Sequence, residues 1–325
     1  MRKIAFFNIK GGIGNTTTVY NLAWMFSEMG IKTIAVDFDP QSDLTAMFLR
    51  DSRLEEIYSD SHPHTLLDTI TPIVNGEPAI SVPSEEINEN LRLIPGHLAL
   101  STFEDLLSEA WLKCLNSEEY SFRISSIFKT ITDHVAKDFG AEVVLMDVGP
   151  NLGSINRAVN ISSDFIVMPV SSDLFSSQAL KNLGITLNKW KVQWQQRRDL
   201  KPSNLNNTIP ENRSKPLGYI MIQHSAKESN PVQSNLDRAN KIPVVYSEFV
   251  LNEASGSNIS AEKDENCLGL LKQFKSLDPM SKEAKKPIFL LKPADGAIGA
   301  HAYAVRKGYM EYEVLAKRIL SSCRC

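Results

Sequence analysis

Residues 6–18 read FFNIKGGIGNTTT, a glycine-rich turn between an apolar run and a helical pattern. Gly11, Gly12 and Gly14 let the backbone curl so that successive N–H groups converge on an anion. The amino terminus of the following helix adds about half a positive charge at the same point. The stretch therefore predicts a phosphate-binding loop, in which Asn15 stands where such loops carry a lysine.

The flanking residues place this loop in a βαβ unit. Residues 3–8 form a short apolar run, typical of a fully buried strand, and residues 32–39 contain a second one. Between them apolar residues recur at helical spacing, and Gly30 follows the last of them as a helix C-cap residue. Two parallel strands joined by a helix imply a right-handed crossover.

Strand patterns alternate with helical patterns over most of the chain. Further strands are predicted at 91–95, 141–149, 164–170 and 217–223. This alternation predicts an α/β fold with one doubly wound, mostly parallel β-sheet flanked by helices. We expect a single domain over residues 1–325, with polar insertions near 51–88, 195–215 and 252–287.

Carboxylates follow the predicted strands at the edge where ligands bind in open α/β sheets. Asp37 and Asp39 end one apolar run, and Asp147 ends another. Asp147 is placed to hold Mg²⁺ through water, and the Thr16 hydroxyl is placed to ligate the same ion. Thr17 can donate a hydrogen bond to an α-phosphate. The alternative interpretation is that the aspartates only cap helices or turns.

The composition is that of an ordinary globular protein. Hydrophobic residues make up 42% and charged residues 22%, and a net charge of −3 gives no global bias toward nucleic acid. A local basic patch is still compatible with this balance. The cysteines lack zinc-ligand spacing, and no apolar stretch reaches the ~18 residues of a membrane span. We expect free thiols, no membrane association and a cytoplasmic location.

Two long stretches carry a family resemblance. Residues 8–45, beginning NIKGGIGNTTT and ending VDFDPQSDLT, resemble the deviant Walker A region and first switch of the ParA/MinD ATPases. Residues 144–183, beginning VLMDVGPNLG, resemble their Walker B region and second switch. The resemblance implies a P-loop NTPase that binds ATP or ADP with Mg²⁺ and forms a nucleotide-dependent sandwich homodimer. The implied function is plasmid or chromosome partition, or intracellular cargo positioning.

The resemblance also assigns roles to single residues. Lys10 is similar to the signature lysine that reaches the partner subunit's nucleotide, and Asp39 is similar to the acid that positions the attacking water. Thr16 and Asp147 match the magnesium shell. The implied nucleotide-binding residues are Gly11, Gly12, Ile13, Gly14, Asn15, Thr16, Thr17 and, near adenine, Gln223 and residues 240–245.

Two residues depart from the family pattern. Gly149 replaces a proline and is expected to loosen the second switch, and Asn15 replaces the loop lysine. A charge-assisted hydrogen bond contributes roughly 1.5–3 kcal/mol and a neutral one about 1 kcal/mol, so nucleotide affinity should fall about tenfold. Hydrolysis should slow by on the order of 10²–10³, although Lys10 from a partner subunit can partly compensate. Alternatively, Asn15 simply caps the helix that it begins.

The partners expected from the resemblance are a second copy of the chain, non-specific DNA, and a protein activator or cargo adaptor. DNA binding would imply association with the nucleoid. Candidate DNA contacts are the mixed cationic and aromatic residues 189–198 and Lys285, Lys286, Arg306, Lys307, Lys317 and Arg318. A membrane-binding tail is disfavoured, because the last helical pattern is better explained by packing on the sheet. The rival function is a non-hydrolysing, nucleotide-dependent switch that recruits a protein partner.

Overall fold

An eight-stranded sheet organises the chain, in the order β3-β4-β2-β5-β1-β6-β7-β8. The computed structural model describes residues 1–59, 64–77, 82–173, 175–205, 208–223, 238–254, 259–274 and 276–323. Neighbouring strands are parallel, except that β3 is antiparallel to β4 at one edge. The strands are β1 (Arg2–Phe6), β2 (Thr33–Asp37), β3 (Glu85–Asn88), β4 (Leu91–Ile94), β5 (Val143–Asp147), β6 (Phe165–Ser171), β7 (Lys215–Gln223) and β8 (Cys267–Lys272).

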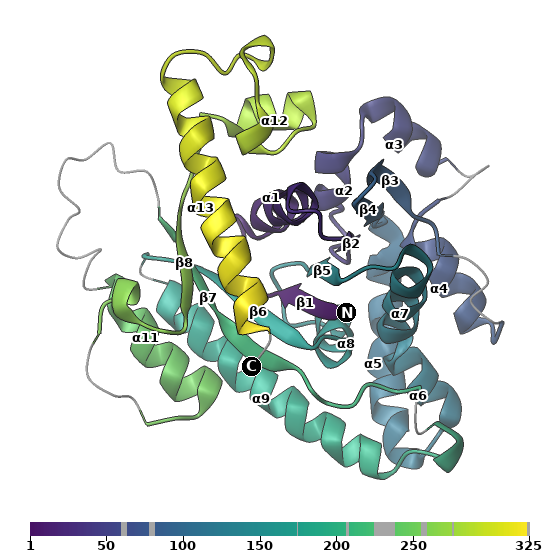
Figure 1. Cartoon of the computed structure of the whole chain (residues 1–325). Helices are drawn as coiled ribbons and strands as arrows, with labels where there is room; N and C mark the ends of the chain where they lie inside the picture. Colours follow the sequence, from purple (N-terminus) through teal and green to yellow (C-terminus); the bar gives the residue numbers. More distant parts are fainter. Residues whose placement is uncertain are drawn as a thin grey trace.

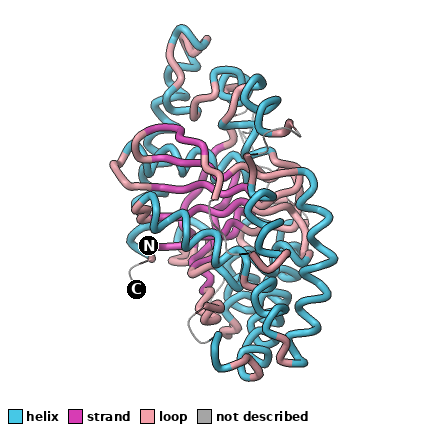
Figure 2. The backbone as a smooth tube through the Cα atoms, turned by 90° about the vertical axis from the view of Figure 1, so that its right-hand side faces the viewer, coloured by secondary structure: helices cyan, strands magenta, loops and turns pink. Residues whose placement is uncertain are grey.

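Helices cover both faces of this sheet (Figures 1 and 2). Apolar side chains of α1, α2, α3 and α13 pack on one face, and those of α5, α7, α8 and α9 pack on the other. The helices are α1 (Asn15–Glu28), α2 (Asp43–Phe48), α3 (Asp51–Ile57), α4 (Leu66–Val74), α5 (Phe103–Lys113), α6 (Glu119–Ser125), α7 (Ile127–Phe139), α8 (Ser154–Ser162), α9 (Ser176–Asp199), α11 (Lys241–Val245), α12 (Asp278–Ala284) and α13 (Ala300–Ser322). The predicted doubly wound, mostly parallel α/β fold is therefore confirmed.

The strand order brings distant loops together. β1 lies between β5 and β6 at the centre of the sheet, and β2, β5 and most of β1 are fully buried. Both faces of a central parallel strand are covered, which explains the continuous apolar runs in the sequence. Since parallel strands end at the same edge, the loop after β1 meets the loops after β5 and β6.

Some elements differ from the sequence prediction. The edge strand β3 was not expected, because its sequence EEIN is polar and only partly buried. β8 lies inside the stretch 252–287 that was interpreted as a polar insertion, and Gly269 interrupts its short apolar run. Residues 121–140 have one continuous helical pattern in the sequence but belong to two helices, α6 and α7, which meet at Ser126.

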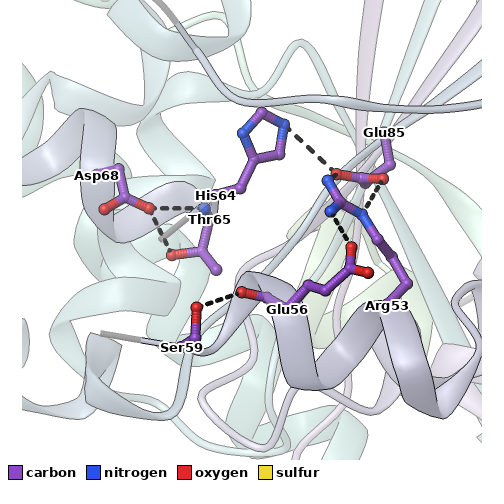
Figure 3. Close-up of polar contacts among 7 residues, drawn as sticks. All are labelled: Arg53, Glu56, Ser59, His64, Thr65, Asp68 and Glu85. Carbon is purple, nitrogen blue, oxygen red and sulfur yellow. Dashed lines mark hydrogen bonds and ion pairs between the residues drawn. The ribbon is translucent and has the colours of Figure 1, made fainter. Parts of the chain in front are cut away.

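The stretch 51–88 was expected to be a polar loop, but it contains α3, α4 and β3. Its charged side chains bind one another (Figure 3). The Arg53 guanidinium donates to both carboxylate oxygens of Glu85, at 3.0 and 2.7 Å, and to Glu56 at 2.6 Å. His64 Nε2 lies 3.4 Å from Glu85. These contacts tie α3 to the edge strand, so the insertion is folded onto the sheet.

Three residues of the candidate DNA-binding stretch 189–198 lie in the interior, whereas Lys189 and Lys191 are exposed and Arg198 is half-buried. Trp190, Trp194 and Arg197 are 5%, 0% and 4% exposed, respectively. Arg197 donates to the carbonyl oxygens of Trp111 and Gln193. The prediction is therefore wrong for Trp190, Trp194 and Arg197, because α9 turns these side chains inward. A cationic surface at the exposed Lys189 and Lys191 stays a prediction. Within the described ranges, every helix is too short or too polar to cross a lipid bilayer.

Candidate functional site

The loop after β1 curls around the amino terminus of α1. Gly12 and Gly14 have φ values of 75° and 105°, in the left-handed region that glycine adopts without strain. Gly14 is the N-cap of α1, and its carbonyl accepts the Thr18 N–H at 2.9 Å. The Lys10 N–H donates to the Asn8 side chain at 3.1 Å. The loop geometry therefore agrees with the expected anion-binding turn at a helix amino terminus.

A cavity of about 560 Å³ opens in front of this loop. That volume lies in the range of ligand pockets, ~300–1,000 Å³. The glycine loop, Asp39, Lys272 and Lys282 contribute its polar surface. Val148 and Pro150 of the loop after β5, with Ile222, Leu271, Phe274, Ile288 and Tyr312, contribute apolar and aromatic surface. None of the last four was predicted from the sequence. Leu271 and Phe274 fall in residues 252–287, which had been interpreted as an insertion, and Ile288 directly follows that stretch. Tyr312 lies in the final helix, which had been interpreted only as packing on the sheet.

The Asn15 side chain points to the carboxyl end of β5. Its Nδ2 donates to Asp147 Oδ1 at 2.7 Å, and it lies 3.2 Å from the Phe6 carbonyl and 3.4 Å from the Val148 carbonyl. The helix N-cap is Gly14, and no side chain caps α1. The alternative that Asn15 caps the helix is therefore wrong. Its amide instead connects the glycine-rich loop, which follows β1, to the end of β5. The two strands are neighbours in the sheet.

Asp147 and Thr16 lie together, as the sequence predicted. Asp147 is fully buried, and burial raises its pKa well above the usual range, as does the nearby Asp37 carboxylate, against hydrogen bonds from Thr16 and Asn15. Asp147 Oδ2 has no hydrogen-bond partner among the described residues. A buried, unsatisfied carboxylate oxygen beside a hydroxyl is a donor set that fits Mg²⁺, which prefers oxygen ligands.

Asp37 lies next to the site but does not line the cavity. It is fully buried, and its Oδ2 accepts the Thr45 N–H at 2.8 Å and the Thr45 hydroxyl at 2.6 Å. Burial raises the pKa of Asp37 to about 7, although the hydrogen bonds from Thr45 oppose this shift. Thr45 Oγ1 also accepts the Gly96 N–H at 2.9 Å, which connects β2 to the segment after β4.

Asp39 lies against the β5–α8 loop (residues 148–153). Its Oδ1 accepts the Gln41 N–H at 3.0 Å, and burial raises its pKa. A Cβ atom on Gly149 would lie 3.0 Å from that oxygen, so the missing side chain admits the carboxylate. From the sequence, Gly149 was expected to loosen this loop. In the structure, Gly149 lets the β2–α2 and β5–α8 loops come into contact.

Lys10 is held within its own chain. Its Nζ forms an ion pair with Asp173, in the loop between β6 and α9. Asp173 also accepts hydrogen bonds from the Ser171 and Ser176 hydroxyls and from the Phe175 N–H. Burial alone would raise the pKa of Asp173, but the hydrogen bonds from Lys10 and Ser171 hold it below the usual range. Asp173 was missed in the sequence, although it follows a buried strand as Asp37 and Asp147 do.

The residues assigned to adenine are only partly described. Gln223 is the last residue of β7, and its side chain lies outside the described part of the structure. Residues 241–245 form the short helix α11. Of the other predicted site residues, Asp147 is buried and does not line the cavity. The others line one cavity together: Lys10, Gly11, Gly12, Ile13, Gly14, Asn15, Thr16, Thr17 and Asp39.

Comparisons with known proteins agree with this geometry. A family model described as an AAA domain matches residues 1–201. An uncharacterised protein of Methanocaldococcus jannaschii is 28% identical over 246 residues, which cover 74% of this chain and 82% of that protein. The chromosome-partitioning ATPase Soj of Thermus thermophilus is 24% identical over 188 residues, 58% of this chain and 61% of Soj. The cell division protein PomZ of Myxococcus xanthus is 25% identical over 182 residues, which cover 56% of this chain and 50% of PomZ. The chain thus spans about half the length of some of the curated relatives that it matches.

Solved structures share the fold over nearly the whole chain. A crystal structure of a Corynebacterium diphtheriae protein has a TM-score of 0.73 at 23% identity, covering 99% of this chain and 98% of that one. A putative plasmid partition protein of Borrelia burgdorferi bound to AMPPNP has a TM-score of 0.58 at 16% identity, covering 98% of each chain. Together with the family match over residues 1–201, these similarities show that the chain belongs to the ParA/MinD-like P-loop ATPases.

Proposed function

We propose that the chain is a ParA-like ATP-binding protein that forms a nucleotide-dependent homodimer and acts in plasmid or chromosome partition, or in cargo positioning. The observation that carries the proposal is the curled glycine loop at the amino terminus of α1, open to a cavity of about 560 Å³. The relatives named as partition and cell-division proteins support the biological role.

The loop amides and the helix terminus would hold the phosphates. Neither depends on a side-chain cation, so binding survives the replacement of the loop lysine by Asn15. Thr16 and Asp147 would hold Mg²⁺, which when bound neutralises charge on the phosphate oxygens. Asp39 is the carboxylate at the cavity that is placed to orient an attacking water. The apolar side of the cavity, with Phe274 and Tyr312, suits a purine ring.

Hydrolysis in this chain should be slow. The Asn15 amide donates to Asp147, so it supplies no donor aimed at the phosphates in this arrangement. Lys10, the lysine assigned to the partner subunit's nucleotide, is paired with Asp173 and would have to leave that carboxylate to reach a second subunit. Both features oppose stabilisation of the charge that develops during phosphoryl transfer.

Isothermal titration calorimetry with Mg-ATP tests the proposal directly. We expect binding in the micromolar to submillimolar range, and an increase in protomer count by light scattering when a non-hydrolysable ATP analogue is added. No heat at millimolar nucleotide would contradict nucleotide binding. A constant monomer mass in saturating analogue would contradict dimerisation alone.

A non-hydrolysing switch that recruits a protein partner is the second candidate. The folded insertion of α3, α4 and β3 supports it, because phosphate chemistry does not require this surface. Bound nucleotide without phosphate release, with or without DNA, would favour the switch. Turnover stimulated by DNA or a partner would favour the partition ATPase.

DNA binding has weaker support from the side chains. Among the candidate residues, Lys285 donates to the Ala46 carbonyl, Lys286 pairs with Asp295, and Lys317 pairs with Glu313. Lys307 lies beside Lys272, and its hydrogen bond and its positive charge lower the pKa of Lys272. The ATP-loaded protein should show salt-sensitive retention on duplex DNA if this part of α13 is a phosphate contact.

A further inference from the structure

The β5–α8 loop depends on a residue from outside the nucleotide site. α8 begins immediately after this loop, and its N-cap residue Gly153 provides no side-chain hydrogen bond. The first turn of α8 also contains no acidic residue. The amino terminus of α8 therefore needs an acceptor from another element, because its first N–H groups have no partner within the helix.

Glu104, from the first turn of α5, supplies that acceptor. Its Oε2 accepts the Ser154 N–H at 2.5 Å and the Ile155 N–H at 3.3 Å. A Cβ atom on Gly153 would lie 2.6 Å from Glu104 Oε1, so the carboxylate reaches the helix only because residue 153 has no side chain. A carboxylate accepting backbone N–H groups makes charge-assisted hydrogen bonds, which are stronger than neutral ones.

A second contact fixes the same two helices one turn further along α8. The Arg157 guanidinium lies 4.4 Å from the centre of the Trp111 ring of α5. Arg157 also donates to the Ser154 hydroxyl at 3.3 Å. Contacts at Glu104 and at Trp111 together set both the position and the rotation of α8 relative to α5.

α8 in turn holds the β5–α8 loop. The Asn156 amide, in the first turn of α8, donates to the Gly149 carbonyl at 2.7 Å and to the Asn151 carbonyl at 2.8 Å. Gly149 is the residue against which the Asp39 carboxylate packs. A path of direct contacts thus leads from Glu104 through Ser154 and Asn156 to the carboxylate that faces the cavity.

Residues 96–104, which lead into α5, are also bound to β2 at their first residue. The Gly96 N–H donates to Thr45 Oγ1, and Thr45 binds Asp37. Residues 96–104 therefore span from the base of the β2–α2 loop to the start of α8, so Glu104 comes from an anchored segment.

From these contacts we propose that Glu104 is a positioning residue for the nucleotide site, acting through α8 on the β5–α8 loop. The inference rests on the proposed function for its nucleotide, but the contact itself can be measured without one. Glu104 does not line the cavity. Its loss should change the placement of the loop and the rate of hydrolysis more than it changes nucleotide affinity.

Hydrogen exchange measured by mass spectrometry tests this, with Glu104→Ala and Gly153→Ala as independent ways to open the same contact. Gly153 has φ −77°, so alanine fits its backbone, but its Cβ would displace the ends of two side chains, Glu104 and Asn151. The matched control is Glu109→Gln, since Glu109 lies on the same helix, is 58% exposed and pairs with Lys113.

Without nucleotide, we expect amides of residues 148–156 to exchange about tenfold faster in both test variants than in the control. Exchange in β5 should stay unchanged, which separates a local effect from general destabilisation. Equal exchange at 148–156 in Glu104→Ala and Glu109→Gln would overturn the proposal. So would faster exchange spread evenly over the chain in both test variants.

Nucleotide then separates the two hypotheses. With Mg-ATP, residues 10–18 should be protected in wild type and in all variants, while protection of 148–156 should be lost in Glu104→Ala and Gly153→Ala. In an Asn15→Lys background, phosphate release should fall about tenfold with ATP affinity changed less than about threefold. Absent protection at 10–18 in wild type refutes the nucleotide proposal, whereas full protection of 148–156 in both variants refutes the role of Glu104.

Discussion

Replacing Asn15 by lysine should restore fast hydrolysis. The wild-type amide makes one short bond, 2.7 Å to Asp147, and two longer ones to the Phe6 and Val148 carbonyls. A lysine places its nitrogen two atoms further along the side chain, and residue 15 lines the cavity, so we expect the ammonium to turn away from β5 and into that cavity. Its ammonium can then donate to phosphate oxygens, and its charge favours the ionised form of the buried Asp147.

The expected magnitudes differ between binding and turnover. Exchanging a neutral donor for a charged one contributes about 1–2 kcal/mol to binding, which corresponds to about fivefold to thirtyfold in ATP affinity. In the transition state, one preorganised donor is worth on the order of 10²–10³ in rate. Loss of the Asn15–Asp147 bond should lower the stability of the nucleotide-free protein by about 1 kcal/mol.

Calorimetry with Mg-ATP and phosphate release at saturating nucleotide measure both effects. Asn15→Gln is the matched control, because it lengthens the side chain without adding charge and should leave turnover at the wild-type level. Equal phosphate-release rates for wild type and Asn15→Lys, with nucleotide bound in both, would refute the reasoning.

Three further predictions concern Asp173, Asp37 and Thr16. Asp173→Asn should release Lys10 and raise the association constant of the nucleotide-bound dimer about fivefold, as measured by sedimentation equilibrium. The control Ser176→Ala keeps the ion pair and should leave this constant unchanged. An unchanged association constant in Asp173→Asn would contradict the role of the ion pair. Burial raises the pKa of Asp37 from 3.8 to about 7, so its stabilising contribution is present below about pH 4 and lost as pH rises through 7. Asp37→Asn should therefore be more stable than wild type at pH 8, by at most about 4 kcal/mol, and not at pH 4. Urea unfolding that gives the same free-energy difference between variant and wild type at both pH values would exclude this cause. Chelating Mg²⁺ should lower the ATP affinity of wild type at least about tenfold, and that of Thr16→Ala much less, as measured by calorimetry. An equal loss of ATP affinity in both proteins would show that Thr16 is not a metal ligand.

The sequence by itself determined the central βαβ unit, the curled loop and the carboxylates at the strand ends. These features are local: glycines at positive φ, continuous apolar runs and helical spacing are properties of neighbouring residues. Gly12 and Gly14 adopt the expected conformation, Asp39 lines the cavity, and Asp147 ends β5 at the expected edge of the sheet. Local pattern failed for β3 and β8, whose short or polar sequences become strands only when they pair with a neighbour.

Only the tertiary structure decided what the key side chains touch. Asn15 and Asp147 are 132 residues apart, and Lys10 and Asp173 are 163 apart. They meet because β1 lies between β5 and β6, an order that no single segment encodes. The same holds for Glu104, which reaches α8 across the α5–α8 interface, and for Trp194, which α9 turns inward. Chemical type and spacing identify which residues can bind a nucleotide, whereas strand order and helix packing determine which partners they have.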